Sequence, residues 1–297
     1  MNARALRWNA EGLDWPHREC SQFIEAGGTV WHVQRMGHGP VMLLVHGTGA
    51  STHSWRELAA LLAAHFTVIM PDLPGHGFTA PLAAAQMSLP GIATSLAALL
   101  AALHLSPHWV VGHSAGAAVL ARMCLDQTIA PHLLISLNGA LLPLSGLSTV
   151  WFAPVARLMA GSDMFAALLA SRARSPGVVK RLIDGTGSHL DDQGIQWYAR
   201  LVSNRGHVAG VLQMMAHWNL EALRRDLPRL ATPLLLIVGT ADRTVEPQQA
   251  QRIAVLVKQV QVRHLAGLGH LAHEEAPALI ADHILQCTAP HRTGAAA

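Results

Sequence analysis

The chain has 297 residues, of which 51% are hydrophobic and 13% charged, and its formal net charge is +3 at pH 7. This composition excludes an intrinsically disordered chain, and so small a net charge does not indicate a nucleic-acid partner. Residues 79–121 contain no Lys, Arg, Asp or Glu, but prolines and glycines divide them into segments too short to span a bilayer. We therefore expect a globular protein with a large buried core.

The start of the chain and its cysteines favour a cytoplasmic protein. Residues 1–8 are not followed by the apolar block of a secretory signal. The three cysteines, Cys20, Cys124 and Cys287, are widely spaced and are expected to be reduced thiols. No cofactor is expected. A peripheral contact with a membrane stays open, as does binding of an acidic small molecule.

Short β-like runs alternate with helical patterns along most of the chain. The expected strands are residues 29–34, 41–45, 66–70, 109–111, 133–137, 233–238 and 260–265. The expected helices between them are residues 54–64, 90–105 and 117–122. Strands separated by helices predict an α/β fold with a mostly parallel sheet and helices on both faces.

Residues 141–221 interrupt this alternation, because they show helical patterns and no convincing strand. We expect short helices at residues 151–159, 164–172, 178–183, 194–201 and 206–220. The segment is interpreted as a helical cap between two parts of one core, residues 1–140 and 222–289, with residues 290–297 as a flexible tail.

The cap offers large apolar side chains for a substrate pocket, although most of them are expected to fill the core of the cap itself. They are Trp151, Phe152, Met159, Met164, Phe165, Met214, Met215 and Trp218. Five are taken as candidate pocket residues: Trp151, Phe152, Met214, Met215 and Trp218. Flexible methionines suit a large planar or greasy ligand.

A Gly-His-Ser-Ala-Gly segment links the strand at residues 109–111 to the following helix. A strand, a Gly-x-Ser-x-Gly pentapeptide and a helix describe a nucleophile elbow. Gly112 and Gly116 leave room where the strand and helix approach, and the sharp turn lifts the Ser114 hydroxyl above the sheet, near the positive end of the helix. Ser114 is the candidate nucleophile.

A serine nucleophile needs a general base and an orienting carboxylate, which follow it here in the order acid, then histidine. Asp242 and His270 each follow a predicted strand and are the candidate acid and base. Glu246 competes for the first role, and His264 and His273 compete for the second. His270 is favoured because it lies on a glycine-rich strand exit, from which its ring can reach the serine.

The loop after the strand at residues 41–45 has the position expected for an oxyanion hole. The backbone N–H groups of Thr48 and Ala115 are the candidate donors, although the glycines of this loop could serve only a tight turn. His46, Gly47 and His113 are expected to support the site from behind rather than to react. No metal site is predicted, because neither His-Glu-x-x-His nor paired cysteines occur.

The loop after residues 41–45, the Gly-His-Ser-Ala-Gly segment, Asp242 and His270 occur in the same order as the motifs of the α/β-hydrolase superfamily, which the chain resembles over residues 22–286. This resemblance implies an eight-stranded sheet with a helical cap. A closer resemblance is to the BchO family, the magnesium-chelatase accessory hydrolases of bacteriochlorophyll biosynthesis. It is carried by residues 14–16, 46–56, 112–118, 136–143, 185–188 and 269–275. This resemblance implies magnesium chelatase as a partner and a tetrapyrrole as a candidate substrate.

Two functions follow from these observations. The first is a serine hydrolase acting on an ester or related acyl compound, because serine rather than aspartate occupies the nucleophile position. The alternative is a non-catalytic tetrapyrrole carrier or chaperone for magnesium chelatase. Its support is an excess of cap cations that could pair with porphyrin carboxylates: Arg157, Arg172, Arg174, Lys180, Arg181, Arg200 and Arg205.

Overall fold

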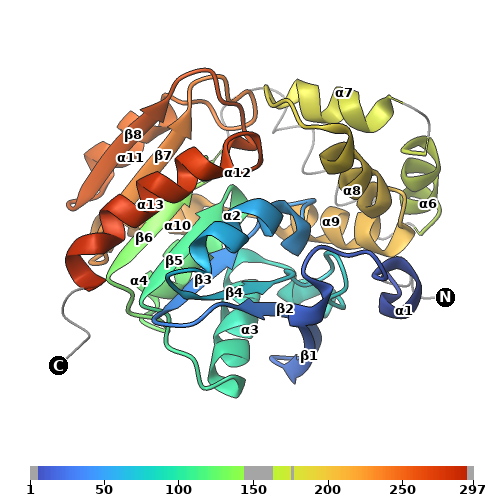
Figure 1. The fold of residues 1–297 in the computed structure, drawn as a ribbon, viewed down its shortest axis with the longest axis horizontal. Helices are drawn as coiled ribbons and strands as arrows, with labels where there is room; N and C mark the ends of the chain where they lie inside the picture. The colour runs from blue at the N-terminus through green and yellow to red at the C-terminus, as the bar shows by residue number, and fades with distance from the viewer. Residues whose placement is uncertain (1–5, 144–162, 175–176, 293–297) are drawn as a thin grey trace.

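One sheet organises the protein (Figure 1) in a computed structural model that describes residues 6–143, 163–174 and 177–292. Within these residues it has eight strands in the order β1-β2-β4-β3-β5-β6-β7-β8. The pairs β1–β2 and β2–β4 are antiparallel, and all others are parallel. The strands are β1 Ser21–Ala26, β2 Thr29–Met36, β3 Val41–Val45, β4 Thr67–Pro71, β5 Trp109–His113, β6 Leu133–Leu137, β7 Leu234–Gly239 and β8 Val260–Leu265.

The expected fold is thereby confirmed, with one strand that the pattern did not reveal. Seven strands were expected at nearly these positions, and β1 is the eighth. It forms a hairpin with β2 through Gly27 and Gly28, whose φ angles of 58° and 85° suit a tight two-residue turn. None of its six residues is fully buried, so the sequence carries only a weak alternating signal there.

Helices cover both faces of the sheet (Figure 1). The core helices are α2 Arg56–Leu62, α3 Leu89–Ala102, α4 Ala115–Leu125, α10 Glu221–Asp226, α11 Gln249–Leu256, α12 Ala272–Glu275 and α13 Pro277–Arg292. Helices α3, α4, α10 and α11 contribute to one buried apolar cluster, and α2 and α13 to another. Along β5, Val110 belongs to the first cluster and Trp109 and Val111 to the second, as the strand period requires.

Between β6 and β7 the chain forms further helices, in the segment expected as the cap. They are α6 Asp163–Arg172, α7 Val178–Gly185, α8 Asp192–Val202 and α9 Arg205–His217. Helix α6 packs against α9, and α8 packs against both α7 and α9. Helix α8 also covers Trp15 near the N-terminus through Trp197 and Leu201. The helix expected at residues 151–159 lies outside the described residues.

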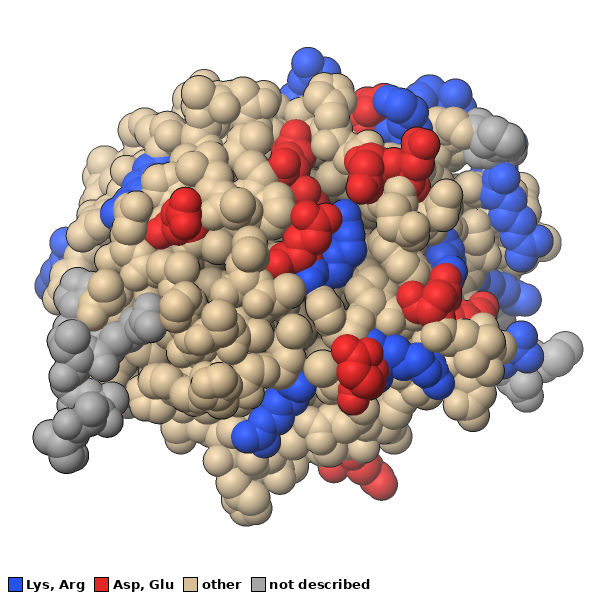
Figure 2. Space-filling model, in the orientation of Figure 1, with Lys and Arg blue, Asp and Glu red and all other residues tan. Residues whose placement is uncertain are grey.

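The C-terminal helix, the cysteines and the charged surface complete the description of the fold. Helix α13 extends to Arg292, three residues into the segment expected as a tail, and residues 293–297 are not described. All three cysteines are free thiols. Over the described ranges, no helix combines the length and apolar character that crossing a membrane requires. On the face shown in Figure 2, acidic and basic side chains are interspersed.

Candidate active site

Ser114 sits in a strained turn between β5 and α4. Its φ of 50° and ψ of −118° are unusual for a residue with a Cβ atom. The flanking glycines are required sterically, since a Cβ on Gly112 would lie 2.4 Å from the Ala117 backbone and one on Gly116 would lie 2.1 Å from the Val45 carbonyl oxygen. The Gly-His-Ser-Ala-Gly segment therefore forms a sharp strand–turn–helix connection that its two glycines make possible.

Asp242 and His270 meet in the loops that follow β7 and β8. The distance between His270 Nδ1 and Asp242 Oδ2 is 2.8 Å, and both side chains are almost fully buried. The other carboxylate oxygen of Asp242 accepts the backbone N–H groups of Thr244 and Val245, at 2.7 and 2.9 Å. The carboxylate is therefore fixed, and it orients the imidazole with Nδ1 as donor and Nε2 left for chemistry.

The competing residues lie elsewhere. Glu246 is exposed, and the carboxylate that pairs with His270 is that of Asp242. His264 is exposed on β8 beside Gln251, at 3.4 Å. His273 lies on the short helix α12, and its buried ring lies against Trp55.

The loop after β3 lies directly against the serine. A Cβ on Gly47 would be 2.9 Å from Ser114 Cβ, so only glycine permits this approach. The backbone N–H groups of Thr48 and Ala115 make no hydrogen bond to another part of the described chain, and both residues line the same cavity as Ser114. Two free amides beside a nucleophile are what an oxyanion hole needs.

Two buried histidines support these loops. The Leu73 N–H donates to His46 Nε2 at 2.8 Å, so the proton lies on His46 Nδ1, which donates to the Gly47 carbonyl. His113 Nε2 lies 2.9 Å from the His270 carbonyl oxygen and donates to it. Burial lowers the pKa of both rings, and for His113 the neighbouring histidines lower it further. These histidines are neutral and fix loop positions.

Asn138, at the end of β6, links the two loops that carry the candidate acid and base. Its side-chain N–H groups donate to the carbonyl oxygens of Gly269 and His270, at 2.8 and 2.9 Å. Its side-chain oxygen accepts the Gly239 N–H at 2.7 Å. We did not identify this role from the sequence, where Asn138 appeared only within a motif shared with the BchO family.

A cavity of about 860 Å³ lies between the carboxyl ends of the strands and the cap. Its walls include Ser114 and His270, together with apolar residues of α7, α8 and α9. Three of the five candidate pocket residues line it: Met214, Met215 and Trp218. The other two, Trp151 and Phe152, lie outside the described residues, and Met164 is 81% exposed instead.

The sequence did not reveal the contribution of helices α7 and α8 to this cavity. Their lining residues are Val179, Leu182, Ile183, Tyr198 and Val202. Tyr198 is the single tyrosine of the chain, and its hydroxyl donates to Glu274 Oε1 at 2.7 Å. The apolar spacing of α7 is the available signal, but from the sequence alone it predicts only a helix.

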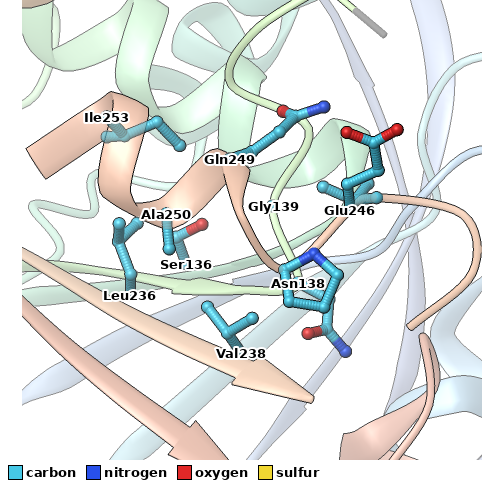
Figure 3. A pocket seen from close by; sticks show the side chains of 11 residues that line it. Ser136, Asn138, Gly139, Leu236, Val238, Glu246, Gln249, Ala250 and Ile253 are labelled. Atoms are coloured by element: carbon cyan, nitrogen blue, oxygen red, sulfur yellow. The ribbon is translucent and has the colours of Figure 1, made fainter. Parts of the chain in front are cut away.

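A second cavity lies between the end of β7 and the start of α11 (Figure 3). Its volume is about 10 Å³, enough for one water molecule and too small for a substrate. The Ser136 hydroxyl and the Gln249 side-chain amide face it without a protein hydrogen-bond partner among the described residues. The large cavity, which Ser114 and His270 line, is therefore the candidate substrate site.

Comparison with known proteins gives the same architecture. A family model described as "alpha/beta hydrolase fold" matches residues 40–277. The chain belongs to this family. Among solved structures, this α/β-hydrolase fold chain is similar to the epoxide hydrolase CorEH, with a TM-score of 0.76 and 22% identity over 92% of this chain and 99% of that one. At that identity the likeness concerns the fold alone.

Sequence relatives are closer. The chain is 37% identical to the "Magnesium-chelatase 30 kDa subunit" of Rhodobacter capsulatus, over 93% of this chain and 95% of that protein. It is 28% identical to the pimeloyl-[acyl-carrier protein] methyl ester esterase of Xanthomonas oryzae pv. oryzae, over 80% of this chain and 91% of that enzyme. The resemblance to α/β hydrolases and to a magnesium-chelatase subunit is thus confirmed.

Proposed function

We propose that the protein is a serine hydrolase that cleaves an ester with a large apolar group. The observation that carries the proposal is the shared wall of the 860 Å³ cavity, where Ser114, His270 and the Thr48 and Ala115 residues come together. The Asp242–His270 hydrogen bond lies directly behind this wall. This set of groups has the composition that acyl transfer requires.

These groups support a serine-hydrolase mechanism. His270 Nε2 takes the hydroxyl proton as Ser114 Oγ attacks the ester carbonyl carbon, and the Asp242 carboxylate stabilises the imidazolium that forms. The Thr48 and Ala115 amides donate to the oxyanion. His270 then protonates the leaving alcohol, an acyl-enzyme remains on Ser114, and water activated by the same histidine releases the acid.

The cavity walls indicate the substrate class. Glu221 is the one acidic residue among the described lining residues, and no Lys or Arg is found among them. Two of the cap cations are paired elsewhere, Arg200 with Asp14 and Lys180 with Asp184. A substrate carboxylate inside the cavity would therefore be desolvated without a cation, which favours a neutral, apolar ester of the size expected for a ligand pocket.

The 37% identity to the magnesium-chelatase subunit supports an accessory role in magnesium insertion during bacteriochlorophyll biosynthesis, in the cytoplasm or at a membrane surface. The same similarity supports the alternative of a non-catalytic tetrapyrrole carrier. The cavity favours a neutral ester over a free porphyrin carboxylic acid as the ligand, because its described walls carry no Lys or Arg to pair with carboxylates. We therefore expect a porphyrin dimethyl ester to bind more tightly than the free dicarboxylic acid.

The test is hydrolysis of p-nitrophenyl esters with acyl chains of increasing length. Because each methylene buried in an apolar wall contributes about 0.8 kcal/mol, kcat/KM should rise about three- to fourfold per methylene until the cavity is filled. A succinyl ester of matched length, which carries a carboxylate, should react more slowly. Activity that persists in Ser114→Ala, or a preference for the succinyl ester, contradicts the proposal.

A genetic experiment separates the hydrolase from the carrier. In a photosynthetic host that lacks its own copy of the related accessory protein, wild type should restore bacteriochlorophyll formation and Ser114→Ala should not. Full restoration by Ser114→Ala would show that catalysis is not the biological role, even with esterase activity present in vitro. Porphyrin binding by Ser114→Ala, measured through tryptophan quenching, would then support the carrier.

A further inference from the structure

The turn that joins α7 to α8 contacts two loops at the same time: the loop after β7, which carries Asp242 (the acid loop), and the loop after β8, which carries His270 (the base loop). The backbone N–H of Arg243, which directly follows the candidate acid, donates to the Thr186 carbonyl at 3.0 Å. The backbone N–H of Leu271, which directly follows the candidate base, donates to Ser188 Oγ at 2.7 Å. We call residues 186–189 the cap turn. It forms hydrogen bonds with the residue that follows Asp242 and with the residue that follows His270.

Glycines make this contact close. Gly187 has a φ of 84°, and a Cβ on it would lie 2.0 Å from the Ala241 carbonyl oxygen. A Cβ on Gly269 would lie 2.3 Å from the Gly187 carbonyl carbon. The backbone of the cap turn thus packs against the backbone of both loops, and a side chain on either glycine would separate them.

A carboxylate from α12 completes the junction. Glu275 accepts the His189 N–H through Oε1 at 3.1 Å and the Gly269 N–H through Oε2 at 2.9 Å. Ser188 is fully buried, whereas Glu275 is half-buried at the edge. One buried and one half-buried polar side chain therefore join the cap turn to the loop that carries His270.

We propose that Ser188 is a positioning residue, which sets the His270 ring relative to Ser114 through the Leu271 N–H. The proposal rests on the proposed hydrolase function. It makes the cap turn part of the catalytic arrangement rather than only an anchor for the cap. Thr186 of the same turn lines the substrate cavity, so a bound substrate contacts the element that orients the base.

The test is steady-state kinetics of Ser188→Ala on the best p-nitrophenyl ester. Because a small misplacement of a catalytic group is sufficient to slow the chemical step, kcat should fall about 10- to 100-fold while KM changes less than about threefold. The low-field proton resonance of the Asp242–His270 hydrogen bond should shift or disappear. Glu275→Gln, which is safer for folding, should lower kcat about three- to tenfold and move the same resonance.

Ser88→Ala is the matched control, because Ser88 Oγ also accepts a backbone N–H, that of Gly91, but at the start of α3. It should leave kcat and the resonance unchanged. If Ser188→Ala and Glu275→Gln both keep kcat within twofold and the resonance in place, the positioning role is refuted. If wild type fails to react with a fluorophosphonate probe, the hydrolase proposal itself has failed, which is a distinguishable result.

Discussion

The strained backbone at Ser114 predicts that the conformation of this residue lowers the stability of the fold. At φ 50° and ψ −118°, a residue with a Cβ atom pays about 1–3 kcal/mol in strain. Ser114→Gly relieves this strain but adds about 0.5–1 kcal/mol of backbone entropy cost, whereas Ser114→Ala keeps the Cβ atom and the strain. Both variants lack the hydroxyl, so their difference isolates the backbone. We expect Ser114→Gly to be more stable by about 1 kcal/mol.

Urea unfolding followed by tryptophan fluorescence measures this difference. The two variants should have the same slope of unfolding free energy against urea, and Ser114→Gly should have the higher midpoint. Neither variant should hydrolyse esters. Equal midpoints, or a lower midpoint for Ser114→Gly, would refute the conclusion that the elbow is strained.

Three further predictions concern stability and the candidate triad. Burial lowers the pKa of His273 to about 3, so the folded protein binds no proton at this ring between pH 7 and 5, whereas the unfolded chain does. Acidification from pH 7 to 5 should therefore lower the free energy of unfolding by about 2 kcal/mol through this ring. Urea titrations at the two pH values measure this loss, which should be absent in His273→Leu. Gly187→Ala should destabilise the fold by about 3 kcal/mol or more, because its Cβ would clash with a carbonyl oxygen, whereas Gly267→Ala, with a similar φ and open space around it, should cost only about 1 kcal/mol in thermal unfolding. Asp242→Asn should reduce kcat about 10⁴-fold with little change in KM, and a loss below tenfold would remove Asp242 from the triad.

The core and the candidate triad could be predicted because their signals are local. Continuous apolar runs such as Leu234–Gly239 are buried on both faces, which gives a strand signal with few alternatives. Ser114 lies in a pentapeptide whose glycines are required by atoms of the adjacent backbone. Asp242 and His270 follow neighbouring parallel strands, so their loops emerge at the same edge of the sheet.

The cap could be predicted only as a set of helices. In α6 every residue from Met164 to Ala170 is apolar, so the sequence cannot show which side faces inward, and Met164 is in fact exposed. The bond from Leu271 to Ser188 joins residues 83 positions apart. A side chain that accepts a distant backbone N–H leaves no periodic pattern, which is why Ser188 and Asn138 could not be given roles before the structure.

The proposed hydrolase requires Ser114 to be an activated nucleophile. The most direct measurement is intact-protein and peptide mass spectrometry after exposure to a fluorophosphonate probe. We predict one adduct per chain, located on Ser114, with labelling abolished in Ser114→Ala and greatly slowed in Asp242→Asn. An unlabelled wild-type protein, or an adduct on another residue that persists in Ser114→Ala, would contradict the role of Ser114 as nucleophile.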